Sequence, residues 1–280
     1  MDFRTEVKIE KSPWQIQPTD RLLFVGSCFA SEIGQRFADH LFQATVNPFG
    51  VMYNPASILH TLQRMFPADD RQKAVGFAVP DVVVLTLGTN HVYVQNETGE
   101  IVDNCQKRPQ RLFTEQVLSV SECAQYLQQC IALLQRINEH VKIVITVSPI
   151  RYAKYGFHGS QLSKATLLLA VHEASQAVTP SPFIYFPAYE IMNDELRDYR
   201  FYKEDMLHPS PQAVTFISQR FADAFFSDLT RDYLRELRPI LQALNHRPFN
   251  PDSEEYRRFL EQAQQQLAAF RQKYHIAEVR

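Results

Sequence analysis

The stretch LLFVGSCFA at residues 22–30 decides the fold. Its apolar start predicts a buried strand, Gly26 permits a tight turn, and the residues from about Ser31 onward indicate a helix. Ser27 lies on this bend, where we expect its hydroxyl to face solvent with the N–H groups of the helix behind it. The same pattern also fits an ordinary strand-to-helix turn with a serine cap, so the rest of the chain must decide between them.

Strand and helix signals alternate along the chain, which is typical of a parallel sheet with crossover helices. Apolar runs predict strands near residues 21–26, 44–47, 81–87, 142–147 and 183–187. Apolar residues at three- and four-residue spacing predict a helix over about 115–139, and turn residues at 96–99 predict a hairpin over 92–103. We therefore predict an α/β fold, a three-layer α/β/α sandwich with a parallel sheet of about five strands.

The chain changes character after about residue 228, where charged, amphipathic helices begin. We therefore divide it into a domain at 1–228 and a helical C-terminal extension at 229–280. Ser253 is the predicted cap of a final helix with an apolar stripe at three- and four-residue spacing. The stripe consists of Leu260, Ala263, Leu267, Phe270 and Tyr274. Two heptads are too short for a free coiled coil, so docking on the same chain is favoured over a homodimer contact through these helices.

Composition indicates a globular protein that does not bind nucleic acid or membranes. The chain has 280 residues, of which 45% are hydrophobic, so it can bury a full α/β core. A net charge of −2 gives no electrostatic reason to bind nucleic acid or anionic lipid. The first residues contain no apolar segment, which predicts a cytoplasmic location. The four cysteines have no metal-like spacing and are expected to be free thiols, with no metal or cofactor predicted.

Asp205 and His208 form the first candidate partner set for Ser27. A carboxylate three residues before a histidine can hold the imidazole in one tautomer and stabilise its charged form, as a general base for a serine requires. Pro209 disfavours helix at His208, and Ser210 followed by Pro211 predicts the start of a new helix. We therefore place the pair on a short loop, where a surface Asp and His with no role is the plain alternative.

A second partner set would stabilise an oxyanion. Gly50 and Asn90 each follow an apolar segment, at the carboxyl edge where open parallel sheets bind ligands. The backbone N–H of Gly50, the side-chain amide of Asn90 and the N–H of Ser27 would give three converging donors. Each residue also fits an ordinary turn.

Together these blocks resemble the SGNH or GDSL hydrolases. Gly26-Ser27, Gly50, Gly88-Thr89-Asn90 and Asp205-x-x-His208 occur in the order of the four blocks of that superfamily. The string Gly-Ser-Cys-Phe-Ala is the signature of the GSCFA domain family within it, and the resemblance covers residues 1 to about 225. It implies an esterase, deacylase or acyltransferase with Ser27 as nucleophile, His208 as base and Asp205 as its orienter, and with Gly50 and Asn90 in the oxyanion hole.

The sequence departs from the family at two points, and three other interpretations stay open. The stretch 54–81 is short for the family, and Gln106 replaces an expected histidine. Cys28 is a rival nucleophile, although we expect it to point into the sheet–helix interface, where small buried cysteines are common. Asn90 with His91 would suit a metallophosphatase, but further ligands are missing. A catalytically silent SGNH-fold binding protein is the alternative from another class.

Aromatic and cationic residues lie in two loops that should overhang the site. Arg151 and Tyr152 follow the fourth strand, and Tyr202 precedes Asp205. Aromatic faces beside positive charges suit a small-molecule or carbohydrate ester, including an acyl group carried by an anionic molecule. Aromatic packing with solvated charges explains the same residues without a ligand.

Overall fold

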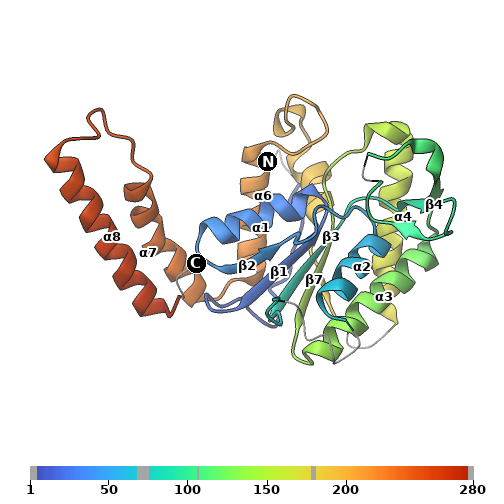
Figure 1. Ribbon diagram of the computed structural model, residues 1–280, viewed down its shortest axis with the longest axis horizontal. Coiled ribbons are helices and arrows are strands. Elements are labelled where there is room, and N and C mark those ends of the chain that lie inside the picture. The colour runs from blue at the N-terminus through green and yellow to red at the C-terminus, as the bar shows by residue number, and fades with distance from the viewer. Residues whose placement is uncertain (1–4, 68–75, 106, 178–180, 277–280) are drawn as a thin grey trace.

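A parallel sheet forms the centre of the molecule (Figure 1). The computed structural model describes residues 5–67, 76–105, 107–177 and 181–276. In spatial order the five strands of this sheet are β2 (Gln43–Val46), β1 (Arg21–Gly26), β3 (Val82–Leu87), β7 (Lys142–Val147) and β8 (Ile184–Tyr185). All adjacent pairs are parallel, with Leu22 opposite both Ala44 and Val82. The predicted strands and their parallel arrangement are confirmed.

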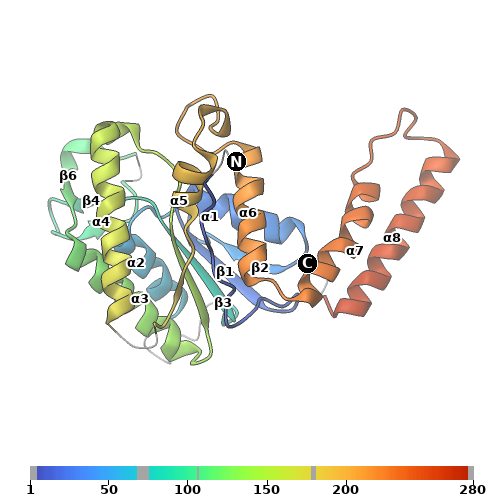
Figure 2. The ribbon, with the colours of Figure 1, turned by 180° about the vertical axis from the view of Figure 1, so that it is seen from behind.

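Helices cover both faces of the sheet, as Figures 1 and 2 show. One face carries α1 (Cys28–Asp39), α5 (Ala188–Glu190) and α6 (Pro211–Phe225). The other carries α2 (Pro55–Met65), α3 (Val120–Ile137) and α4 (Gly156–Gln176). Short helical turns lie at Gln110–Leu112, Ala153–Tyr155, Ile191–Leu196 and Tyr199–Phe201. This arrangement is the predicted three-layer sandwich.

The strands divide their side chains between two apolar cores. Leu22 and Phe24 of β1 face the core under α1 and α6, whereas Leu23 and Val25 face the core under α2, α3 and α4. This alternation follows from the period of two in a strand. Because both faces are covered, every residue of β3 is buried, which explains its continuous apolar run.

A second, antiparallel sheet lies beside the first. Its order is β5 (Ile101–Val102), β4 (His91–Gln95) and β6 (Phe113–Val117). The hairpin predicted over 92–103 is confirmed in β4 and β5. The predicted start of a helix near 115 is wrong, because residues 113–117 pair with β4 and the helix begins at Val120 behind its cap Ser119.

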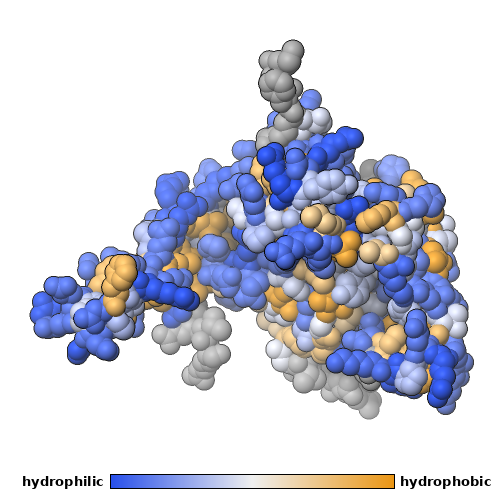
Figure 3. Space-filling view, turned by 90° about the horizontal axis from the view of Figure 1, so that it is seen from above, coloured by the Kyte–Doolittle hydropathy of each residue, from blue (hydrophilic) through white to orange (hydrophobic). Residues whose placement is uncertain are grey.

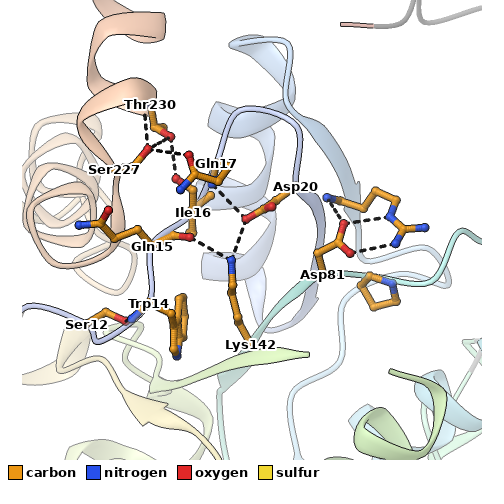
Figure 4. A network of polar contacts seen from close by, with 12 residues as sticks. Ser12, Trp14, Gln15, Ile16, Gln17, Asp20, Asp81, Lys142, Ser227 and Thr230 are labelled. Carbon is orange, nitrogen blue, oxygen red and sulfur yellow. Dashed lines mark hydrogen bonds and ion pairs between the residues drawn. The ribbon is translucent and has the colours of Figure 1, made fainter. Parts of the chain in front are cut away.

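The amino ends of the strands form the structural edge of the sheet. Lys142, the first residue of β7, donates from Nζ to the carbonyl oxygen of Gln15 at 3.0 Å and to Asp20 at 3.3 Å (Figure 4). Thr230 donates to the carbonyl oxygen of Ile16 at 2.6 Å in the same network. These bonds fasten the N-terminal segment and the helix that contains Thr230 to this edge, and they leave the carboxyl edge of the sheet for a site.

The C-terminal helices α7 (Asp228–Leu244) and α8 (Glu254–Tyr274) form an arm that projects from the sandwich (Figures 1 and 2). Ser253 caps α8 as predicted. Phe270 and Tyr274 of the apolar stripe pack on Tyr233 of α7, with ring centroids 4.8 and 5.0 Å away. Tyr233 in turn contacts Phe42 of the main core at 5.2 Å. The stripe is therefore covered at this end by its own chain, and a homodimer through the arm stays a prediction.

A cavity of about 630 Å³ lies at the base of the arm. Its lining includes Phe42, Phe226 and Leu234 beside Arg235 and Arg238. Figure 3 shows hydrophobic side chains in the hollow between the arm and the body. None of the predicted site residues lines this cavity. Within the described residues, no helix is both long enough and apolar enough to cross a membrane.

Candidate functional site

The turn after β1 is built on a close approach of two strands. Gly26 has a φ of +143°, and a Cβ at this position would lie 2.1 Å from the carbonyl oxygen of Thr86 on β3. Its N–H donates to the side chain of Asn47 at 2.9 Å, and the Asn47 amide donates to Ser31 at 2.8 Å. Only glycine fits this contact. The turn is therefore held from β3 on one side and from the loop after β2 on the other.

Ser27 is enclosed at the bottom of this turn. Its exposed fraction is 0%, and its Oγ lies 3.0 Å from Oγ1 of Thr86. The same oxygen accepts the N–H of Phe29 at 3.3 Å, so Ser27 is the N-cap of α1, which begins at Cys28 and not near Ser31. The prediction that the Ser27 hydroxyl faces solvent is wrong, because capping turns it toward β3.

Cys28 lies partly exposed at the first position of α1. Its Sγ is 3.6 Å from the hydroxyl of Tyr53. Burial and the contact with this thiol raise the pKa of Tyr53 to about 12. Cys28 packs against the core under α1 and α6, as expected, but it is partly exposed rather than buried. All four cysteines are free, as predicted, and Cys123 and Cys130 are buried.

The predicted Asp205–His208 pair forms on a loop before α6. Nδ1 of His208 lies 2.6 Å from Oδ2 of Asp205, while the other carboxylate oxygen accepts the backbone N–H groups of Leu207 and His208 at 2.9 and 3.0 Å. The backbone bonds, the largest cause, and the bond to the imidazole lower the pKa of Asp205 to about 2. Met206 adopts a φ of +59° between them, which closes the loop tightly enough for these bonds.

A salt bridge connects this loop with α1. Nζ of Lys203 lies 2.6 Å from Oε1 of Glu32 on α1. The backbone N–H of Lys203 donates to the carbonyl oxygen of His208 at 2.8 Å. Within the described residues, no hydrogen bond joins His208 to Ser27 or Cys28. The structure therefore places turn and loop at the same end of α1 without a direct bond between them.

The three predicted oxyanion donors are engaged within the protein. The N–H of Ser27 donates to Thr86, and that of Gly50 donates to the carbonyl oxygen of Asn47 at 2.8 Å. Asn90 is 2% exposed, and its side-chain amide donates to the carbonyl oxygen of Leu118 at 2.7 Å. Gly50 lines a cavity of about 460 Å³ that Ser27 and Asn90 do not line. Their joint role as oxyanion donors stays a prediction.

The predicted substrate residues separate into two groups. Arg151 and Tyr202 line a cavity of about 270 Å³ with Arg197 and Asn193. Arg151 also donates to the carbonyl oxygen of Met206 at 3.0 Å, between Asp205 and His208. The two residues therefore lie beside the predicted base.

Tyr152 lies elsewhere, against the turn at 26–28. A Cβ on Gly88 would be 2.3 Å from the Tyr152 hydroxyl oxygen and 3.4 Å from Cβ of Ser27. The Tyr152 hydroxyl is buried and has no hydrogen-bond partner among the described residues. Burial raises its pKa well above the ordinary value for a tyrosine, so the hydroxyl keeps its proton. Gly88 thus leaves the space that the Tyr152 hydroxyl occupies.

Lys164 is a buried residue that the sequence analysis did not identify. It is 2% exposed, and its Nζ donates to the carbonyl oxygens of Gly88 at 2.6 Å and Ser148 at 2.8 Å. Burial lowers its pKa to about 7. Its position directly before the mostly apolar run at 165–171 is the available signal in the sequence.

The metal interpretation gains no support from the side chains. Nδ1 of His91 lies 3.0 Å from Glu115, and its ring stacks on Tyr155 at 3.6 Å. Within the described ranges, no group of three or more His, Cys, Asp or Glu side chains could hold a metal ion. Gln106 and residues 68–75 of the short stretch lie outside the described residues.

Several solved structures resemble this chain at low identity. A protein from Parabacteroides merdae described as a GDSL-like lipase has a TM-score of 0.48 and 13% identity, over 76% of this chain and 98% of that one. A mutant acetylxylan esterase from Geobacillus stearothermophilus has a TM-score of 0.44 and 14% identity, over 76% and 97%. A carbohydrate esterase of family 3 from Talaromyces cellulolyticus has a TM-score of 0.38 and 13% identity, over 66% and 70%.

No curated protein sequence matches this chain.

Family models, in contrast, match almost the whole chain. The model of the GSCFA family matches residues 21–78 and 67–221. A second model, described as the C-terminal domain of GSCFA domain proteins, matches residues 237–280. The chain therefore belongs to the GSCFA family.

Proposed function

We propose that this protein cleaves or transfers an acyl group from a small-molecule or carbohydrate ester. A nucleophile on the turn at 26–28 would attack the ester, His208 would act as base and Asp205 would orient it. The observation that carries the proposal is the 2.6 Å contact between Nδ1 of His208 and Asp205. An ionised carboxylate at Nδ1 keeps a proton on that nitrogen and leaves Nε2 as the acceptor, the tautomer that a general base requires.

Loop rigidity supports this role for His208. Three hydrogen bonds to one carboxylate fix the loop at 205–208, and Arg151 binds its carbonyl at Met206. A base held in one orientation avoids reorganisation during proton transfer. His208 retains 33% side-chain exposure, so a bound substrate can reach it.

The neighbouring cavity supports a polar ester as substrate. Arg151 and Arg197 bring two positive charges to it, and Asn193 and Tyr202 add hydrogen-bonding groups. Such a lining can bind the hydroxyls of a sugar or an anionic group on the alcohol. The acyl group would then lie toward the turn, and we assign Arg151 and Tyr202 to substrate binding.

One observation favours the second candidate function, a catalytically silent binding protein. The predicted oxyanion donors Ser27, Gly50 and Asn90 all donate to groups of the protein itself. Donors that are held by other groups of the protein would stabilise the transition state of ester cleavage less well. The two functions differ in whether a covalent acyl intermediate forms.

Ester hydrolysis by purified protein tests the proposal. We would assay p-nitrophenyl acetate and a set of acetylated sugars with the wild type and His208→Ala. Loss of general base catalysis should lower kcat/KM by about 10²- to 10⁴-fold. His172→Ala, at an exposed position on α4, is the matched control and should retain activity. Equal rates for the wild type and His208→Ala would contradict the proposal.

A further inference from the structure

Two side chains on the turn could attack an ester, and the structure distinguishes them. Ser27 is 0% exposed, and its Oγ is occupied by Thr86 and by the N–H of Phe29. A substrate could reach this oxygen only after the cap of α1 had opened. Cys28 is the next residue, and it is partly exposed.

Cys28 lies on the face of α1 that meets the His208 loop. Residues four apart share one face of a helix, so Cys28, Glu32 and Arg36 form a row. Glu32 binds Lys203 at 2.6 Å, and Arg36 donates to Thr215 of α6 at 2.7 Å. The first residue of this row therefore points toward the same segment, at the end where His208 lies.

Hydrogen-bond donors surround Cys28. The Tyr53 hydroxyl is 3.6 Å from Sγ and can donate to a thiolate. As the first residue of α1, Cys28 has a backbone N–H without an intrahelical acceptor, which is available to a ligand.

A second, independent feature indicates a ligand at this place. The Tyr152 hydroxyl is buried without a partner among the described residues, and it is packed over Gly88 and next to Ser27. The Tyr152 and Tyr53 rings meet edge to face at 6.0 Å, so both hydroxyls belong to one cluster around the turn. An unpartnered buried donor is unfavourable unless a bound group accepts from it. The oxyanion of an acyl intermediate is such a group.

We propose that Cys28 is the nucleophile and forms a thioester, with its own N–H and the Tyr152 hydroxyl as oxyanion donors. This inference rests on the proposed acyl transfer and replaces Ser27 as the attacking residue. Ser27 then has a structural role, because it caps α1 and fixes the turn to β3. The Tyr53 hydroxyl is assigned as the hydrogen-bond donor to the sulfur of Cys28.

His208 carries each proton during acyl transfer at this site. The thiol proton of Cys28 moves to Nε2 of His208, and the sulfur electron pair attacks the acyl carbon while the carbonyl π pair moves onto oxygen. Collapse of this intermediate breaks the bond to the alcohol oxygen, which takes the proton from His208, and leaves a thioester. Water, or the hydroxyl of a second substrate, then attacks the thioester and gives its proton to His208. That proton returns to the Cys28 sulfur as the acid or the new ester leaves.

Acyl trapping identifies the attacking atom. The protein would be acidified during turnover of p-nitrophenyl acetate, and the acetylated residue would be located by mass spectrometry after digestion. We expect acetyl on Cys28, and we expect neutral hydroxylamine to remove it, since a thioester is labile and a serine ester is stable under these conditions. Cys28→Ala should lose the adduct and lower kcat/KM by on the order of 10³-fold or more.

Two variants complete the design. Cys105→Ala removes the other partly exposed cysteine and should change neither adduct nor rate. Ser27→Ala should still form the adduct on Cys28, at a lower melting temperature because the cap is lost. Acetyl on Ser27, or full turnover by Cys28→Ala, overturns the assignment but leaves the proposed function intact. A wild type that neither turns over nor becomes acylated contradicts both.

Discussion

The Nζ of Lys164 lies 2.6 Å from the carbonyl oxygen of Gly88, inside the core. A second bond, to Ser148 at 2.8 Å, joins the loops after β3 and β7 through one side chain. The same nitrogen is 5.1 Å from the ring centroid of Tyr152. Lys164 therefore fixes the position of Gly88, against which the Tyr152 hydroxyl packs.

Removal of this amine should change how stability depends on pH. Burial lowers the pKa of Lys164 from its ordinary value of 10.5 to about 7 in the folded protein, so between these values the unfolded chain binds more protons. The free energy of unfolding therefore rises with pH in this window through Lys164, by at most about 1 kcal/mol per pH unit. Lys164→Met should lose this rise, which urea unfolding at pH 7, 8 and 9 would measure as the difference from the wild type.

The free energies of unfolding of the wild type and Lys164→Met must be subtracted, because the buried thiols change stability with pH in the opposite direction. Burial raises the pKa of Cys123 to about 12, so the unfolded chain loses thiol protons first and stability falls at high pH. This effect is common to both proteins and cancels. Lys11→Met, at an exposed position, should follow the wild type. Parallel curves for Lys164→Met and the wild type would show that Lys164 does not titrate in this range.

The close contact between Gly26 and Thr86 should make the protein sensitive to any side chain at position 26. Alanine at 26 would place its Cβ 2.1 Å from the Thr86 carbonyl oxygen, so β1 and β3 would have to separate. We expect Gly26→Ala to destabilise the protein by more than about 3 kcal/mol, measured by thermal and urea unfolding. Gly99 also has a positive φ, of +70°, but open space around its missing Cβ. Gly99→Ala therefore isolates the backbone strain and should cost only about 1–2 kcal/mol. Similar losses in the two variants would show that the strand contact contributes little.

Most of the sheet could be predicted because buried parallel strands leave uninterrupted apolar runs. All six residues of β3 are buried, and the sequence at 82–87 carries that pattern directly. β6 could not be predicted in this way, since only Phe113 of its five residues is buried. Without alternation it carries no signal of a strand, so residues 115–117 are included in the helix predicted over about 115–139.

The site was harder to predict than the sheet. The Asp205–His208 pair depends on local spacing, and the proline at 209 bounds it, so sequence was sufficient. The exposure of Ser27 and Cys28 depends on where α1 begins. A start at Cys28, three residues earlier than predicted, makes Ser27 the buried cap of the helix and leaves Cys28 partly exposed. The partnership with Thr86 depends on strand register, which no local pattern fixes.

The arm should depend on its contact with Tyr233. Phe270 is buried against this ring, at a centroid distance of 4.8 Å, and the cluster continues to Phe42. Phe270→Ala should cost about 3–5 kcal/mol, as expected for a buried phenylalanine. Phe259 lies on the same helix but is 40% exposed, so Phe259→Ala should cost less than about 1 kcal/mol. Unfolding monitored by circular dichroism measures both, and equal small effects would indicate that the arm does not share the main core.

The negative charge of Asp205 should be needed for activity. Its pKa of about 2 in the folded protein lies below its ordinary value of 3.8, so its hydrogen bonds stabilise the protein above about pH 4 and are lost as the pH falls toward 2. The carboxylate thus stays ionised at any pH above about 4 at which the protein is assayed. Asp205→Asn keeps the shape but removes the charge that orients His208, which should lower kcat/KM by about 10²-fold. Glu204→Gln, a neighbouring exposed acid, is the matched control. An unchanged rate and pH profile in Asp205→Asn would mean that the 2.6 Å contact with His208 is structural and takes no part in proton transfer.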